Sequence, residues 1–82
     1  MEFRQLHTFI QAAQLQSFSR AAVQLGYSQS AVTVQIRMLE KELGTRLFDR
    51  MGKQVVLTPQ GQKFLMHANT ILYEVNRTRL SM

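Results

Sequence analysis

The segment from Ser28 to Gly44 constrains the fold more than any other, because its pattern is that of one helix with two different faces. At roughly 100° per residue, four apolar side chains fall on one stripe, which we expect to be buried: Val32, Ile36, Leu39 and Leu43. The opposite face gathers small, polar and basic residues that suit an anionic partner: Ser30, Val34, Arg37 and Lys41, with Thr33 at its margin. Ser28 is suited to cap the start of the helix, and Gly44 to end it in a left-handed conformation.

A shorter helix, residues 18–25, is expected just before this segment, separated from it by the turn Gly26-Tyr27-Ser28. Its inner side carries small and apolar side chains: Ala21, Ala22 and Leu25. Ala22, Gly26 and Val32 fit the three steric positions of a helix-turn-helix: a small residue where the helices cross, a glycine free to take positive φ, and a β-branched residue in the crevice. A generic αα-hairpin would also explain the alanine and the glycine, so this spacing favours DNA binding without establishing it.

Composition strengthens the DNA-binding interpretation. Ten Lys and Arg against five Asp and Glu give a formal net charge of +5, which favours a polyanion as partner. The 82 residues fit one domain, and the absence of cysteine excludes disulfides and thiolate metal sites. No apolar run approaches the length of a membrane span, and the segment MEFRQLHTF lacks the order of a secretory signal. We therefore expect a cytoplasmic location, with no cofactor and no metal.

Two further elements surround this pair of helices. Residues 2–15 read as an amphipathic helix whose inner side is apolar: Phe3, Leu6, Phe9, Ile10 and Ala13. Either Ser17 or Ser19 is suited to cap the short helix that follows. After Gly44 the pattern becomes extended, and residues 47–57 predict a hairpin turning at Gly52. A hairpin directly after a recognition helix is a wing, and the basic side chains that flank its tip, Arg50 and Lys53, suit the sugar-phosphate backbone or the minor groove.

Thr58 and Pro59 signal the start of a long helix over residues 59–82, with Thr58 as cap and proline in the first turn. Residues at alternating steps of three and four form one stripe along this helix: Gly61, Phe64, Ala68, Ile71, Val75, Thr78 and Met82. Leu65 and Leu72 widen the stripe. Such a helix is about 36 Å long, longer than the preceding domain can cover. We therefore divide the chain into a DNA-binding domain, 1–58, and a linker and dimerisation helix, 59–82. The alternative is that the stripe folds onto the first helix of the same copy, which would leave a monomer.

The segment SFSRAAVQLGYSQSAVTVQIRMLEKELGTRLFDR, followed by LTPQG, closely resembles the DNA-binding domain of LysR-type transcriptional regulators over nearly the whole chain. The resemblance depends on a combination of motifs: Phe18 with Ala21-Ala22, Ser28-Gln29-Ser30, Ile36, Leu39-Glu40, Leu43-Gly44, Leu47-Phe48-Asp49-Arg50 and Leu57-Thr58-Pro59 with Gly61. It implies a mainly α fold, namely a winged helix-turn-helix with a short β-hairpin wing and a long C-terminal linker helix that forms a homodimer. A small-molecule effector would bind only through a C-terminal domain that this chain does not contain.

The resemblance also implies which residues meet DNA. Gln29, Ser30 and Thr33 would approach base edges, while Arg50 and Lys53 would act in the wing. The sequence departs from the family at Val34, where members often carry a basic residue or histidine, so a phosphate or guanine contact is in doubt there.

The chemistry of the side chains supports a similar assignment. Gln29 suits a bidentate contact to adenine, and Val34 has only a methyl group to offer to thymine. Arg37 and Lys41 lie deeper along the same face, where guanine and phosphate contacts are both open and we favour phosphate. The helix N-terminus, with the hydroxyls of Ser28 and Ser30, is suited to hold a further phosphate.

Sequence-specific binding of double-stranded DNA is thus the leading hypothesis, and a protein-interaction module built on the long helix is the alternative. An enzyme is the least supported class. His7 and His67 stand far apart, and the acidic residues form no paired-carboxylate motif. We interpret Glu40 and Glu42 as surface ion-pair partners of nearby basic residues: Arg37, Lys41 or Arg46.

Overall fold

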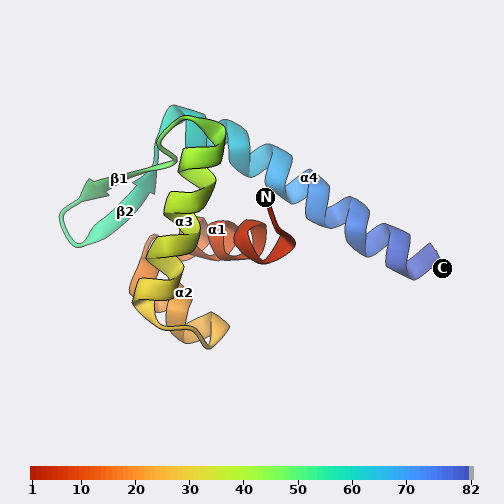
Figure 1. Cartoon of the computed structure of the whole chain (residues 1–82), viewed down its shortest axis with the longest axis horizontal. Coiled ribbons are helices and arrows are strands. Elements are labelled where there is room, and N and C mark those ends of the chain that lie inside the picture. The colour runs from red at the N-terminus through yellow and green to blue at the C-terminus, as the bar shows by residue number, and fades with distance from the viewer. Residues whose placement is uncertain (82) are drawn as a thin grey trace.

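In the computed structural model, which describes residues 1–81, the chain folds into helices arranged around a helix-turn-helix, with a projecting hairpin (Figure 1). The elements follow one another as α1 (Phe3–Leu15), α2 (Phe18–Leu25), α3 (Gln29–Leu43), β1 (Phe48–Met51), β2 (Gln54–Leu57) and α4 (Pro59–Ser81). The two strands are antiparallel neighbours. The hairpin and the far end of α4 point in opposite directions, which gives the molecule its long dimension of 44 Å. This is the winged helix-turn-helix expected from the sequence.

The core forms where α1 meets all the other elements, with Phe9 at its centre. Phe9 is fully buried, and its ring centroid lies 5.4 Å from that of Phe48 and 4.9 Å from that of Phe64. The Phe18 ring packs edge-on against Phe48 at 5.2 Å. These tilted and edge-to-face contacts tie α1, α2, β1 and α4 together through one aromatic cluster.

The helix-turn-helix is built as its capping residues predict. Gly26 has φ of 75°, and the N–H groups of Gly26 and Tyr27 donate to the carbonyls of Val23 and Ala22 at 3.4 and 2.9 Å. This is a Schellman motif, which requires a left-handed residue at the glycine. At the next helix start, the Ser28 hydroxyl accepts from the Ala31 N–H at 3.1 Å. The turn between α2 and α3 is therefore fixed by local hydrogen bonds.

Of the two possible caps of α2, the structure selects Ser17. Its hydroxyl accepts a hydrogen bond from the Arg20 N–H at 3.0 Å, while the Ser19 hydroxyl lies beside it at 3.0 Å. The preceding residue, Gln16, is the one non-glycine residue with positive φ (53°) in the described chain. Its carbonyl accepts from the Val55 N–H at 3.1 Å, so the turn between α1 and α2 holds β2 of the hairpin in place.

The joint between the hairpin and α4 depends on Thr58 and Gly61. The Thr58 hydroxyl accepts from the Gly61 N–H at 2.9 Å and donates to the Arg46 carbonyl at 2.7 Å, and its own N–H donates to the Leu47 carbonyl at 3.0 Å. A Cβ on Gly61 would lie 2.2 Å from the Leu47 carbonyl oxygen. Only glycine allows the first turn of α4 to approach this backbone so closely, and the pattern Thr-Pro-x-Gly is explained by that contact.

Two residues predicted to be buried lie at the surface. Phe3 is 60% exposed, because α1 begins at this residue and its side chain lies beyond the core. Leu43 is 37% exposed, because it is the last residue of α3 and the chain leaves the core there. The periodicity assigned both residues to the correct helical face but could not show where the covering elements end.

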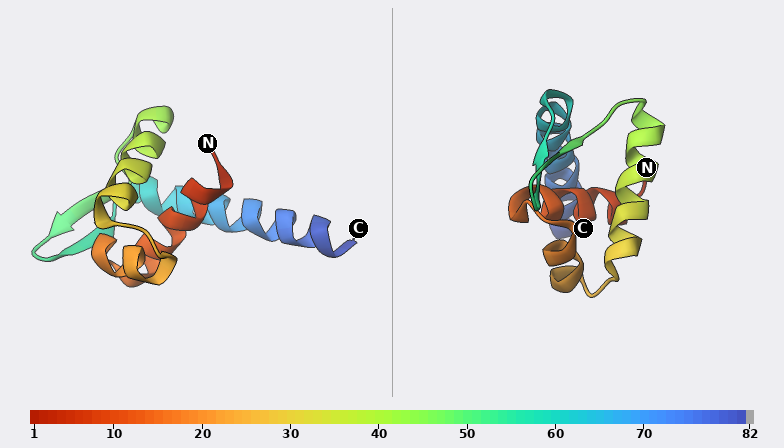
Figure 2. Two further views of the ribbon diagram at one scale, coloured as in Figure 1. Left: turned by 60° about the horizontal axis from the view of Figure 1, so that its bottom comes forward. Right: turned by 90° about the vertical axis from the view of Figure 1, so that its left-hand side faces the viewer.

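The stripe of α4 is covered only over its first half. Phe64 and Ala68 are buried, Ile71 and Leu72 pack partly against the core, and Thr78 is exposed. Beyond these contacts α4 extends away from the other elements (Figure 2). Met82, the last position of the predicted stripe, lies outside the described residues. Within the described part of the chain, no helix is long and apolar enough to cross a membrane.

Candidate nucleic-acid interface

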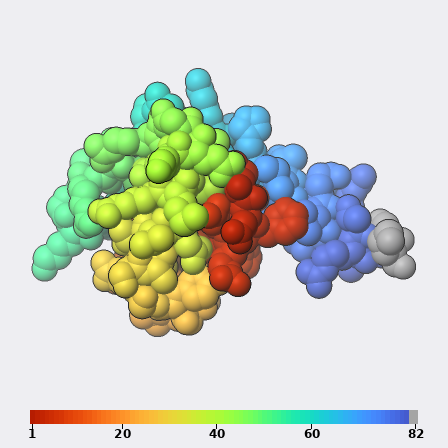
Figure 3. Space-filling view, viewed as in Figure 1, coloured from red at the N-terminus to blue at the C-terminus, as the bar shows by residue number. Residues whose placement is uncertain are grey.

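The exposed face of α3 carries most of the residues singled out from the sequence. Thr33 is half-buried, and five others are exposed: Ser28, Gln29, Ser30, Val34 and Arg37. Lys41 is exposed two turns beyond Val34. On the other face Val32, Ile36 and Leu39 are buried, as predicted. Figure 3 shows α3 (yellow to green) at the front of the molecule with the hairpin at its left.

The rotation of α3 about its axis is fixed by a polar contact as well as by apolar packing. Thr8 on α1 is fully buried, and its hydroxyl donates to the Gln35 side-chain oxygen at 2.6 Å. A buried hydroxyl without a partner would cost stability, so this pair favours one orientation of α3. In that orientation Val34 and Arg37 face away from the core.

At the start of α3, the hydroxyl groups already have partners within the chain. Ser28 receives the Ala31 N–H, and the Ser30 hydroxyl lies 3.2 Å from that of Ser28. The Thr33 hydroxyl donates to the Gln29 carbonyl at 3.1 Å, as threonine commonly does inside a helix. The exposed Gln29 side chain is therefore the amide group at this end of α3 that is available for a bidentate contact.

The hairpin places two further basic side chains beside α3. Arg50 pairs across the strands with Val55, and Gly52 turns the tip with φ of 62°, as predicted. Arg50 and Lys53 are both exposed. Phe48, at the base of the hairpin, and Val55, the cross-strand partner of Arg50, are buried, so the core-facing side of the hairpin is packed along both strands.

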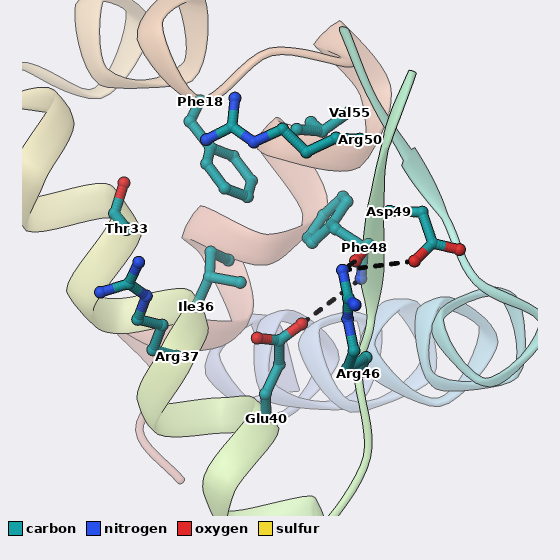
Figure 4. A pocket seen from close by; sticks show the side chains of 10 residues that line it. All are labelled: Phe18, Thr33, Ile36, Arg37, Glu40, Arg46, Phe48, Asp49, Arg50 and Val55. Carbon is teal, nitrogen blue, oxygen red and sulfur yellow. Dashed lines mark hydrogen bonds and ion pairs between the residues drawn. The ribbon is translucent and has the colours of Figure 1, made fainter. Parts of the chain in front are cut away.

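A cleft of about 130 Å³ lies between α3 and the hairpin (Figure 4). It is lined by residues of α2, α3 and both strands, and of the segment that precedes β1: Phe18, Thr33, Ile36, Arg37, Glu40, Arg46, Phe48, Asp49, Arg50 and Val55. Arg37 projects from α3 at the left of the view, and the Arg50 side chain extends from β1 along the top toward Phe18. Two guanidinium groups from separate elements therefore line one cleft, which suits an anionic partner.

Glu40 has a different role from the one predicted. In the described chain it is not the partner of a basic side chain, because its carboxylate accepts from the N–H groups of Leu47 and Phe48 at 2.8 and 3.4 Å. Arg46 pairs instead with Asp49 at 3.3 Å and donates to the Phe48 carbonyl at 3.2 Å. Glu40 thus fastens the start of the hairpin to α3. Its partners lie seven and eight residues away, just before β1 and at its first residue, so no local pattern signals the contact.

The described residues contain no group of three or more His, Cys, Asp or Glu side chains that could hold a metal ion. The exposed side chains of α3 and the hairpin offer amide, methyl, ammonium and guanidinium groups. Such groups match base edges and phosphates.

The family is decided by comparison with known proteins. The sequence profile of the lysR family of bacterial regulatory helix-turn-helix proteins matches residues 3–62. The chain belongs to this LysR family. Among curated relatives, the HTH-type transcriptional regulators YwqM and CitR of Bacillus subtilis are 49% and 44% identical to it over 72 residues, 88% of this chain. The chain spans about a quarter of the length of these relatives, since the matched part is 25% of each.

Solved structures of LysR-family proteins share the fold. The DNA-binding domain of BenM, in complex with benA site 1 DNA, superposes with a TM-score of 0.94 at 36% identity, covering 99% of this chain and 94% of that one. The DNA-binding domain of CbnR, in complex with DNA, gives 0.91 at 40% identity and covers 95% and 90%. The winged helix-turn-helix of this LysR-family chain is thereby confirmed over nearly its whole length.

Proposed function

We propose that this chain binds double-stranded DNA in a sequence-specific manner, as the DNA-binding part of a LysR-type transcriptional regulator. The observation that carries the proposal is the joint surface of α3 and the hairpin, with exposed basic side chains on both: Arg37 and Lys41 on α3, Arg50 and Lys53 on the hairpin. The similar domains of BenM and CbnR, both solved in complex with DNA, support it.

In this proposal α3 lies in the major groove and the wing lies on the backbone or in the minor groove. Gln29 makes a bidentate contact to adenine, and Ser30, Thr33 and Val34 approach base edges. Ser28 and the N-terminus of α3 hold a phosphate through exposed backbone N–H groups. Arg37 and Lys41, like the wing residues Arg50 and Lys53, contact the sugar-phosphate backbone.

The test is selection of bound duplexes from a pool with a randomised centre, followed by titration of the recovered site over a range of salt concentration. We expect a recurrent sequence and an affinity that falls steeply with salt, because phosphate contacts release counterions. A protein-interaction module would instead show no preferred sequence and little dependence on salt, and that result would refute the proposal.

The part of α4 that the core leaves uncovered supports a homodimer through residues 59–82. Phe3, Ile71 and Val75 line a groove of about 500 Å³ beside the outer half of α4. Apolar surface left in water costs about 25 cal/mol for each Å², so these side chains favour a partner. The same helix from a second copy would form a closed two-fold interface and would set the spacing of two recognition helices.

Sedimentation at micromolar concentration tests the dimer. We expect the parent chain to be dimeric and the pair Ile71→Glu with Val75→Glu to be monomeric. The matched control is Gln62→Glu with Asn69→Glu, which adds the same charge to exposed positions of α4. Because Ile71 also packs against the core, Phe3→Ser provides a second variant at an exposed site. A monomeric parent, or a dimer that survives in both test variants, would contradict the interface.

A further inference from the structure

We propose that Thr33 and Val34 together form a methyl surface that recognises the C5-methyl groups of thymine, and that this surface determines part of the sequence preference. The inference rests on the proposed placement of α3 in the major groove. It assigns a chemical target to the position where the chain departs from the basic residue common in LysR-type regulators.

Val34 is an apolar side chain that the fold does not use. It is 53% exposed, whereas Val32 and Ile36, two residues to either side, are 0% and 2% exposed. The same helix therefore buries two of these three side chains and presents the third to solvent. Val34 lies on the face that also carries Ser30 and Arg37, at the middle of the surface proposed to meet base edges.

Thr33 contributes its methyl group because its hydroxyl proton is already used. The hydroxyl donates to the Gln29 carbonyl at 3.1 Å, one helical turn back. This bond holds the side chain in one rotamer, so the position of the methyl group is fixed as well. Thr33 is half-buried and lines the cleft beside the hairpin, which places it next to Val34 toward the wing.

Both side chains are stiff. A β-branched residue in a helix has few χ1 rotamers, and valine has essentially one, so little side-chain entropy is lost when the methyl groups meet a partner. At the major-groove edge, thymine is the base that presents a methyl group, while the other bases present donors and acceptors there. A methyl group placed against the donors and acceptors of the other bases displaces water without replacing its hydrogen bonds. Binding to sites with another base at that position is therefore weaker.

The probe is thymine replaced by uracil, which removes the methyl group and keeps the hydrogen-bonding edge. In the site recovered by selection, each thymine is replaced in turn and the affinity is measured for the parent chain. We expect about a fourfold loss at one or two positions, the equivalent of about 0.8 kcal/mol for one methyl group returned to water. Replacement elsewhere should have no effect.

Variants of the protein show which side chain, Val34 or Thr33, contacts each thymine whose replacement weakens binding. Val34→Ala should abolish the effect of uracil at one position, whereas the control Val23→Ala, at a valine of α2 that is 84% exposed, should keep it. Thr33→Ser removes the methyl group and should abolish the effect at the neighbouring position. Thr33→Val keeps a methyl group without the hydroxyl and should retain it.

The outcomes separate this inference from the proposed function. A preferred sequence whose affinity is unchanged by every uracil replacement would overturn the methyl surface and leave DNA binding standing. Equal uracil sensitivity in the parent chain, Val34→Ala and Thr33→Ser would overturn it too. Binding without any preferred sequence would refute both the methyl surface and sequence-specific recognition.

Discussion

Replacement of Gly61 by alanine tests the tightest contact in the fold. Gly61 lies in the first turn of α4, and an added Cβ would meet the Leu47 carbonyl oxygen at 2.2 Å and its carbonyl carbon at 3.1 Å. Both are backbone atoms, so no side-chain rotation relieves the overlap. Either α4 or the segment before β1 must move, and the movement strains the hydrogen bonds of Thr58 to the carbonyls of Arg46 and Leu47.

The size of the effect follows from three contributions. Alanine gains about 1 kcal/mol over glycine in a helix. Forced repacking of a tight site costs about 1–3 kcal/mol, and weakening of the two hydrogen bonds costs about 0.5–1.5 kcal/mol each. We expect a net loss of about 1–5 kcal/mol in the free energy of unfolding. For a domain of this size each kcal/mol lowers Tm by roughly 4–8 °C.

Thermal and urea unfolding followed by circular dichroism measure this loss. Gln62→Ala, one residue further along the exposed side of α4, is the matched control and should leave stability unchanged or slightly raised. Gly44→Ala provides a second comparison: its Cβ would meet no atom within 4 Å, so its cost comes only from φ of 70°. If Gly61→Ala is as stable as Gln62→Ala, α4 does not approach Leu47 as described and the reasoning is wrong.

Three further predictions concern the proposed DNA interface and the contact that holds the hairpin to α3. Replacing both Arg50 and Lys53 by alanine should weaken binding to all duplexes alike and flatten the slope of log affinity against log salt by about one unit per lost phosphate contact, and an unchanged slope would show that the wing does not touch the backbone. Gln29→Ala should cost about 1–3 kcal/mol on the selected site and much less on random DNA, and equal losses would assign Gln29 to the backbone. Glu40→Ala should lower the free energy of unfolding by about 1–3 kcal/mol, because two backbone N–H groups lose their acceptor. Glu40→Gln keeps an acceptor oxygen and should retain most of the parent stability, and equal stability of the two variants would contradict the contact.

The sequence predicted the parts of the fold that depend on neighbouring residues. Ser28 and Thr58 cap helices, and Gly26, Gly44 and Gly52 take positive φ, as their positions indicated. Each of these features depends on hydrogen bonds or backbone angles within a few residues, so the pattern contains the information. The order of elements and the register of the helix-turn-helix follow from them.

Burial at the ends of the helices could not be predicted in the same way. The periodicity of α1 and α3 gave the face on which Phe3 and Leu43 lie, but burial also requires another element to lie opposite. For Phe3 the opposite surface is the outer half of α4, which lines one groove with it and leaves the ring 60% exposed. How far α4 covers α1 is set by the angle between these helices, which no local pattern encodes.

By itself, then, the sequence determined the helix-turn-helix and the wing, because capping, turn chemistry and periodicity are short-range properties of the chain. Only the tertiary structure decided that Glu40 fastens the hairpin to α3, that Gln16 holds Val55 from a left-handed turn, and that Gly61 admits the Leu47 backbone. Each of these contacts joins groups between 7 and 39 residues apart, at distances set by the packing of whole helices. They fix the wing relative to the recognition helix, and that geometry exists only once the core has formed.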